Sequence, residues 1–151
     1  VPFIFAGEEM MRDKKGVHNS YNSPDSINTI DWKNKTAHKD VFEYVKGLIA
    51  MRKAHPAFRM GDADMVRRQL EFLPVENTNV VAFILKDNAN GDSWKNIIVA
   101  LNSREEPVKL DFQSCKDTVS CIDCKINMKG LGQVSGAELM VPARSAMIIH
   151  Q

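Results

Sequence analysis

The period of apolar and polar positions changes near residue 60. Before it, residues 39–54 (KDVFEYVKGLIAMRKA) place apolar side chains at helical spacing and charges on the other face, which predicts an amphipathic helix. Pro56 cannot continue this helix, and a residue that precedes proline disfavours helical angles. We therefore expect the helix to end at His55.

The pattern after this helix predicts one short helix and then β-strands. Residues 61–70 (GDADMVRRQL) predict a short helix with Asp62 or Asp64 near its N-terminus. Seven short apolar or β-branched runs follow, separated by turn signals at a spacing of roughly 8–14 residues. These runs are residues 71–75, 79–87, 95–102, 107–112, 118–124, 137–141 and 145–150. They predict an antiparallel sandwich or barrel.

One pair of these runs predicts a long β-hairpin. Residues 79–102 (NVVAFILKDNANGDSWKNIIVALN) hold two apolar runs around a polar tip that contains Asn90 and Gly91. The tip sequence DNANGD resembles a calcium loop, but it lacks the alternating acids and the closing Glu of that loop. A hairpin tip is the favoured interpretation, and a cation site is the alternative.

The first ten residues and the stretch after them differ from both patterns. Residues 1–7 (VPFIFAG) are almost wholly apolar and predict a short, fully buried strand of the parallel-sheet kind. Residues 10–32 are polar, rich in Asn, Ser, Asp and Gly, and show little periodicity. A loop of about 25 residues in a compact protein is more often functional than idle. The chain thus predicts an α/β unit without its partners, followed by a β domain of about 90 residues.

Composition narrows the classes of function. The chain has 151 residues, of which 44% are hydrophobic and 26% are charged, and this composition is globular. A formal charge of +1 predicts no electrostatic capture of nucleic acid or of an anionic membrane. No apolar run approaches the roughly 20 residues of a membrane helix, and the apolar start lacks the flanks of a signal peptide. Because the first residue is not Met, we expect a processed or truncated chain, and we assign no compartment from targeting signals.

Three cysteines, Cys115, Cys121 and Cys124, lie within ten residues. Zinc sites use four Cys or His ligands in two pairs, and a redox C-x-x-C opens a helix, whereas TVSCIDC alternates like a strand. We expect thiols on a strand and its adjoining turn, with no metal and no cofactor. An odd number of cysteines without an evident pairing favours a reducing compartment weakly.

Two carboxylates, Glu8 and Glu9, follow the apolar start. Glycoside hydrolysis uses two carboxylates, roughly 5 Å apart in retaining enzymes. Adjacent strand residues point to opposite faces, so these two cannot converge on one bond while the chain is extended. If the chain has already turned, the acids favour a helix N-terminus, and this structural interpretation is the preferred one.

The loop HNSYNSPDS offers a second set of polar groups. These are His18, Asn19, Tyr21, Asn22 and Asp25, and an aromatic ring among amides and a carboxylate suits the recognition of sugars. The same residues are also ordinary turn formers, so a connector remains an equal alternative. Elsewhere, Trp94 is a candidate sugar platform, and His55 is more typical of a helix end than of a catalytic base.

Three stretches resemble one family. Residues 1–32, the run YVKGLIAMRKAHPAFRM and the run NGDSWKNIIVALN closely resemble the C-terminal part of type I pullulanases. These are α-1,6-debranching enzymes of glycoside hydrolase family 13, within the α-amylase superfamily. The resemblance is strongest over residues 1–102 and weakest over 103–135, and the cysteine run is not associated with the family.

The resemblance implies a layout of two parts. Residues 1–58 would be the end of a catalytic (β/α)8 barrel, with its last strand, an active-site loop and its last helix. Residues 59–151 would be an antiparallel β-sandwich, so the chain is an α+β fragment. The family's catalytic acids lie in earlier barrel segments and match neither Glu8 nor Glu9, so we expect no catalytic residue in this chain.

The resemblance also implies an activity and a binding loop. The parent enzyme would hydrolyse α-1,6 linkages in pullulan, amylopectin or limit dextrin, and its missing barrel segment would be the partner of this chain. Asn19 and Tyr21, and less directly Asn22 and Asp25, would face the glucan. The β domain would brace the barrel, and an accessory carbohydrate-binding module is the alternative.

Overall fold

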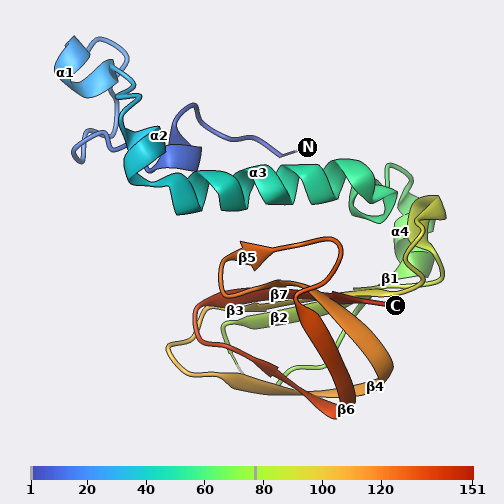
Figure 1. The fold of residues 1–151 in the computed structure, drawn as a ribbon. Coiled ribbons are helices and arrows are strands. Elements are labelled where there is room, and N and C mark those ends of the chain that lie inside the picture. The colour runs from blue at the N-terminus through green and yellow to red at the C-terminus, as the bar shows by residue number, and fades with distance from the viewer. Residues whose placement is uncertain (1, 77) are drawn as a thin grey trace. The chain divides into compact units, whose positions relative to one another are not determined.

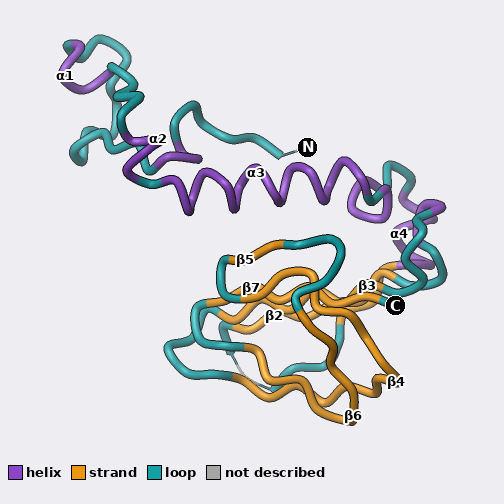
Figure 2. Tube along the Cα trace, in the orientation of Figure 1, coloured by secondary structure: helices purple, strands orange, loops and turns teal. Residues whose placement is uncertain are grey.

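The computed structural model describes residues 2–76 and 78–151, except for the side chains of residues 112–116 (Figures 1 and 2). The chain divides into two compact units, Val1–Lys46 and Gly47–Gln151. The division falls inside the longest helix, α3 (Lys39–Ala54). The domain boundary expected after residue 58 stays a prediction.

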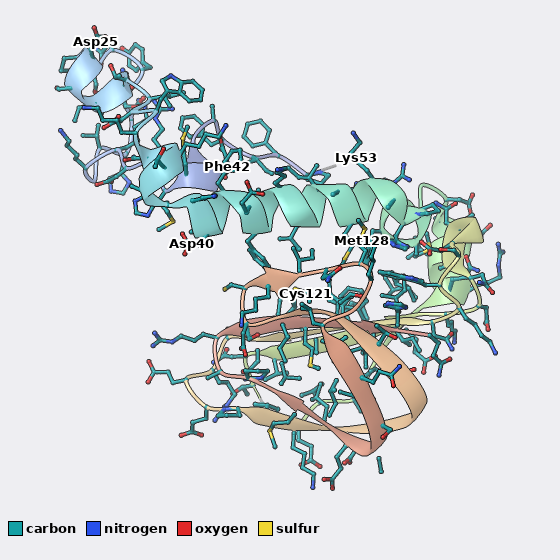
Figure 3. The ribbon with its side chains drawn as sticks, in the orientation of Figure 1. Asp25, Asp40, Phe42, Lys53, Cys121 and Met128 are labelled. Carbon is teal, nitrogen blue, oxygen red and sulfur yellow. The ribbon has the colours of Figure 1, made fainter. Side chains whose placement is uncertain are left out.

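The first unit is built from short helices joined by irregular chain. Its elements are the 3-10 helix η1 (Glu8–Met10), α1 (Asp25–Asn28), α2 (Asn34–Ala37) and the first half of α3. The ammonium of Lys35 on α2 lies 4.5 Å from the ring centre of Phe42 on α3, which is labelled in Figure 3. The polar stretch predicted as one long loop therefore contains single helical turns.

In this chain taken by itself, residues 2–6 do not form the buried strand that was predicted over residues 1–7. Residues 2–6 form no strand, and the side chain of Phe3 is 92% exposed. A β-strand is stable only when its backbone groups are paired, and no described strand of this chain pairs with the segment. Gly7 then adopts φ 99°, a left-handed conformation that turns the chain into η1.

The two helices predicted around residue 60 are confirmed. Helix α3 spans Lys39–Ala54, and His55 leaves the helical region at φ −108° and ψ 101°. The 3-10 helix η2 (Pro56–Arg59) follows, with the proline in its first turn. Helix α4 (Ala63–Gln69) is capped by Asp62, whose Oδ1 accepts a hydrogen bond of 2.8 Å from the Met65 amide.

The second unit contains an antiparallel sheet in the order β1-β2-β3-β7-β4-β5, in which β6 also pairs with β4 (Figure 1). Its strands are β1 (Leu70–Phe72), β2 (Val80–Leu85), β3 (Ile97–Asn102), β4 (Val108–Ile122), β5 (Lys125–Ile126), β6 (Gly132–Val141) and β7 (Ser145–His150). The antiparallel β domain is thus confirmed in outline.

The strands belong to one curled sheet, which is closer to the barrel than to the two-sheet sandwich among the architectures expected from the strand pattern. The runs predicted as separate strands at 107–112 and 118–124 are both part of β4. The register of β4 with β6 shifts between Asp111 and Ser114 and again between Ser114 and Asp117. Such irregularities bend a strand and increase its twist. The bend in β4 curls the sheet, so β4 can pair with β6 along one part and with β7 along another.

The curl encloses a single apolar core on one face of the sheet. Side chains of β2, β3, β4, β6 and β7 meet there in an alternating pattern. The buried members are Val80, Ala82, Ile98, Ala100, Val108, Leu110, Val119, Leu139, Val141, Met147 and Ile149.

The predicted hairpin of β2 and β3 is confirmed. Val80 pairs with Asn102 and Leu85 pairs with Ile97, so the ladder is continuous. The 3-10 helix η3 (Ala89–Gly91) forms the tip, where Asn88 and Asn90 adopt left-handed angles.

The C-x-x-C run spans a strand end and a tight turn. Cys121 is buried on β4, and its Sγ lies 3.7 Å from the Ala146 carbonyl oxygen. Cys124 is exposed in the two-residue turn between β4 and β5, where Asp123 and Cys124 have φ of 48° and 57°. The side chain of Cys115 lies outside the described residues.

Two neighbouring residues of β6 test the inward and outward alternation. Leu139 is 2% exposed in the core and Met140 is 57% exposed on the other face. Leu139→Ala should lower the free energy of unfolding by about 2–4 kcal/mol, because it leaves a cavity. Met140→Ala should change it by less than about 0.5 kcal/mol. Urea unfolding followed by circular dichroism measures both, and equal losses would contradict the alternation.

Candidate functional site

The predicted sugar-binding residues lie on the surface of the first unit. Asn19, Tyr21, Asn22 and Asp25 are all exposed, and the side chain of Tyr21 is 84% accessible. The Ser23 amide donates a hydrogen bond of 3.0 Å to the Ser20 carbonyl, which closes a β-turn over residues 20–23. Tyr21 and Asn22 occupy the two central positions of this turn.

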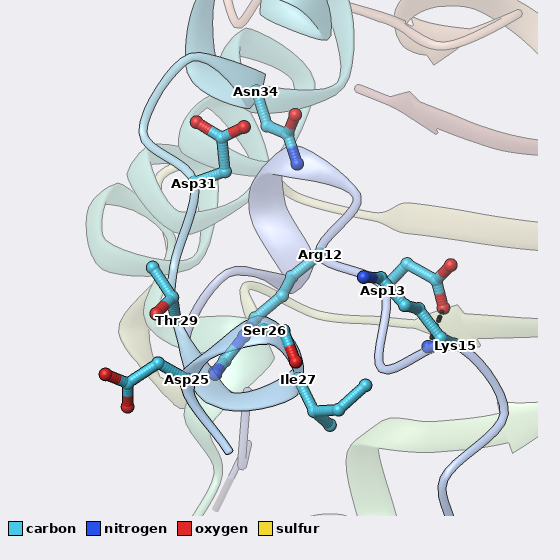
Figure 4. Close-up of a pocket in the computed structure, with 9 residues that line it drawn as sticks. All are labelled: Arg12, Asp13, Lys15, Asp25, Ser26, Ile27, Thr29, Asp31 and Asn34. Carbon is cyan, nitrogen blue, oxygen red and sulfur yellow. Dashed lines mark hydrogen bonds between the residues drawn. The ribbon is translucent and has the colours of Figure 1, made fainter.

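Asp25 belongs to a separate hollow beside that turn. The hollow has a volume of about 450 Å³, and Figure 4 shows it. It is lined by Arg12, Asp13, Lys15, Asp25, Ser26, Ile27, Thr29, Asp31 and Asn34. Eight of these nine residues are polar or charged, with both charge signs present, and such side chains can hydrogen-bond to hydroxyl groups. Of the four predicted residues, only Asp25 lines it.

The side chain of Asn28 supports the turn from beneath. Its Nδ2 donates to the carbonyl oxygens of Ser20 at 2.7 Å and Ser23 at 2.8 Å. Its Oδ1 accepts a bond of 2.6 Å from Lys14 Nζ, which also donates to Ser20 Oγ at 3.1 Å. We call Asn28, Lys14, Ser20 and Ser23 the Asn28 network.

Arg12 connects this network to the start of the chain. Its guanidinium donates to the carbonyl oxygens of Asn28 and Ala6, the latter at 3.0 Å, and lies 5.1 Å from the Phe5 ring centre. Arg12 Nε is buried and has no hydrogen-bond partner among the described residues. Partial desolvation and the nearby charge of Arg12 lower the pKa of Lys14.

Glu8 and Glu9 hold local backbone in place. Glu8 Oε2 accepts a bond of 3.2 Å from the Phe5 amide, and Glu9 Oε2 accepts one of 3.0 Å from the Gly7 amide. Both acids lie in the first turn of η1, so the chain has turned where they stand. The sequence assigned Glu8 and Glu9 a structural role at a helix N-terminus for the case in which the chain has already turned.

A second polar cluster lies in the other unit, and the sequence did not predict it. The rings of His55 and Trp94 stack with centres 3.4 Å apart, and those of Trp94 and His150 with centres 3.6 Å apart. His55 Nδ1 lies 2.9 Å from Asp92 Oδ1, and both side chains are almost inaccessible. These residues come from the end of α3, the hairpin tip and the end of β7, so sequence proximity could not reveal them.

The cluster resembles part of a catalytic triad, but its surroundings make it structural. Asp92 Oδ2 accepts from the Ala57 amide at 3.1 Å, and its Oδ1 also accepts from the Trp94 amide at 2.9 Å. Burial opposes ionisation of Asp92, yet these bonds and the one from His55 outweigh it and lower the pKa of Asp92. The carboxylate therefore fixes η2 to the hairpin tip.

Trp94 cannot serve as a sugar platform in this arrangement. A sugar ring binds by stacking on an open aromatic face, and the two faces of Trp94 are covered by His55 and His150. The geometry thus argues against an accessory carbohydrate-binding role based on this residue.

The described part of the chain shows neither a metal cluster nor a membrane-spanning helix. Within it, no three His, Cys, Asp or Glu side chains are placed to share a metal ion. None of the described helices has the length and apolar content needed to cross a bilayer.

Comparisons with known proteins point to one family. Residues 66–124 match the family model described as the pullulanase all-beta domain. A pullulanase of Bacillus subtilis (strain 168) is 43% identical over 109 residues, which cover 72% of this chain and 15% of that protein.

Solved structures give the same result. The pullulanase from Bacillus acidopullulyticus superposes with a TM-score of 0.91 at 46% identity, covering 96% of this chain and 18% of that one. The type I pullulanase of Bacillus subtilis str. 168, solved in complex with maltose, gives 0.90 at 33% identity, covering 99% and 21%. The present chain spans at most 21% of the length of these three proteins.

The stacked cluster predicts that the second unit loses stability in acid. Burial and the neighbouring His55 lower the pKa of His150 from 6.5, although Asp117 and Asp92 oppose the shift. The unfolded chain therefore takes up this proton first, and stability falls as the pH drops below 6.5. The lowered pKa of Asp92 adds a second loss below pH 3.8.

Thermal melts between about pH 7.5 and pH 5 measure the first loss. His150→Phe keeps an aromatic ring against Trp94 but cannot titrate, so its melting temperature should fall less over this interval than that of the unchanged chain. His18→Gln, at an exposed histidine of the first unit, is the matched control and should leave the pH dependence as it is. Parallel pH profiles for the unchanged chain and His150→Phe would contradict the assignment.

Proposed function

Because the chain belongs to the pullulanase family and corresponds to the C-terminal portion of such a protein, we propose an activity for the longer protein. This protein hydrolyses α-1,6-glucosidic linkages. The substrates are α-glucans such as pullulan, amylopectin or limit dextrin. Hydrolysis proceeds with retention, through a carboxylate nucleophile and a carboxylic acid that acts as acid and base. These catalytic groups belong to other segments of the protein, and this chain supplies binding surface and support.

The exposed turn over residues 20–23 carries the proposal. Tyr21 offers an open ring face and a hydroxyl, and Asn22 offers an amide beside it. A sugar presents apolar ring faces and vicinal hydroxyls, which match these two groups. The type I pullulanase of Bacillus subtilis was solved with maltose, which supports an α-glucan as the ligand. Asn19 precedes the turn and Asp25 follows it, and on this proposal both residues have a secondary part in glucan binding.

Residues 1–58 form, on this proposal, the last strand, loop and helix of a (β/α)8 barrel. The exposed apolar residues Phe3, Ile4 and Phe5 support it, because such a run gains stability by pairing with neighbouring strands and burying its side chains. The residues after the last barrel strand then lie at the carboxyl-end face, where the active sites of such barrels are found.

The β domain acts as a brace for the barrel's last helix. Met51 of α3 and Ala57 of η2 are each 2% exposed, and the His55–Asp92 contact ties the same segment to the hairpin tip. Burial of this kind contributes about 25 cal/mol per Å² of apolar surface. We expect removal of residues 59–151 from the longer protein to lower its melting temperature by several degrees. An unchanged melt, measured by scanning calorimetry, would count against a bracing role.

Substitutions at Tyr21 test the binding role of the turn. In the longer protein, Tyr21→Ala should raise KM for pullulan roughly tenfold and change kcat by less than about twofold, since a stacking contact is equally strong in the ground state and the transition state. Tyr21→Phe keeps the ring and is the matched control, with a rise of no more than about threefold. Reducing-sugar assays over a range of substrate concentrations give both constants. A KM that is the same in all three proteins would remove Tyr21 from the groove.

The isolated chain tests the placement of the catalytic acids. Residues 1–151 alone should release no reducing sugar from pullulan, because we expect no catalytic acid among them. Sugar release by the purified chain, above that of a heat-treated sample, would refute this.

A further inference from the structure

We propose that Asn28 is a positioning residue that presents Tyr21 and Asn22 to the α-glucan in one fixed orientation. The inference rests on the proposed function, since it concerns how the same turn recognises its ligand. Asn28 itself is half-buried and lies behind the turn, so it acts through the turn and not by touching the sugar.

Three hydrogen bonds engage both polar atoms of the Asn28 side chain. Both Nδ2 hydrogens are donated to the two carbonyl oxygens that bound the turn, those of Ser20 and Ser23, at 2.7 and 2.8 Å. The Oδ1 atom accepts from Lys14 Nζ at 2.6 Å. A side chain that spans both ends of a β-turn fixes the tilt of the turn as well as its closure.

The backbone of Asn28 is also held by hydrogen bonds. Its amide donates to the Pro24 carbonyl at 3.1 Å within α1, and its own carbonyl accepts from Arg12. Arg12 also donates to the Ala6 carbonyl at 3.0 Å. Asn28 and Arg12 thereby link the turn that carries Tyr21 to the backbone of Ala6, near the start of the unit.

Other residue types cannot perform this role at position 28. Aspartate keeps the acceptor for Lys14 but has no hydrogen to donate to the carbonyls of Ser20 and Ser23. Alanine loses all three bonds. In both cases the turn samples several orientations, and the apparent affinity falls in proportion to the fraction of molecules whose turn is correctly placed.

The experiment uses the longer protein with pullulan as the probe. Asn28→Asp and Asn28→Ala should each raise KM roughly five- to twentyfold while kcat stays within about twofold, because the loss is in binding. Asn127→Ala is the matched control: this exposed asparagine also accepts a bond from a turn amide, that of Lys129, but lies in the second unit. It should leave both constants unchanged.

A double variant establishes that Asn28 acts through Tyr21. Asn28→Asp in a Tyr21→Ala background should raise KM by less than about twofold beyond Tyr21→Ala alone, since the positioned ring is already absent. Hydrogen exchange of the Tyr21, Asn22 and Ser23 amides gives a readout apart from activity and should be faster in Asn28→Asp. Because Asn28→Asp keeps the Lys14 contact, it remains informative if Asn28→Ala does not fold.

The outcomes separate the inference from the proposed function. If Tyr21→Ala raises KM and the Asn28 variants do not, the positioning role is overturned and the proposed function stands. Fully additive effects in the double variant, or a loss of kcat and melting temperature without a change in KM, also overturn it. If Tyr21→Ala leaves KM unchanged, the turn does not bind glucan and both are rejected.

Discussion

The second unit depends on the pairing of β4 along both of its edges. One edge of β4 pairs with β6 over Val108–Val119 and with β5 at Cys121 and Ile122, and the other edge pairs with β7 over Thr118–Cys121. Two register shifts let the strand bend between these partners. As a result the inner faces of β6 and β7 meet across a single core, which separate short strands could not enclose.

A second interaction joins the helical segment to this sheet. The Asp92 carboxylate is hydrogen-bonded to the His55 ring and to the amides of Ala57 and Trp94. The ring of Trp94 stacks on the rings of His55 and His150. A buried carboxylate is costly unless such donors surround it, so the cluster holds its parts in one arrangement. This explains why a histidine–aspartate pair that resembles catalytic machinery performs a structural task.

The first unit differs, because several of its large apolar residues are exposed, although Met10 is buried. Phe3, Tyr21 and Trp32 are all largely exposed. Its order comes from polar contacts, and the Asn28 network and the carboxylates of Glu8 and Glu9 fix individual turns. A surface of this kind suits a segment that binds a polar ligand on one side and other parts of a longer protein on another.

Local sequence determined the elements whose causes are local. The period of residues 39–54 together with Pro56 defined α3 and its end, Asp62 capped α4, and the alternation of residues 79–102 defined the β2–β3 hairpin. The quoted motifs were sufficient to identify the family, whereas the binding role of Tyr21 and Asn22 stays a prediction. Tertiary structure alone decided the union of two predicted strands in β4, the stacking of His55, Trp94 and His150, and the support of the turn by Asn28. Each of these depends on contacts made only in the folded chain, whereas periodicity and propensity report on the immediate neighbours along the sequence. The strand predicted at residues 1–7 failed for the same reason, since an apolar run becomes a strand only where another strand pairs with it.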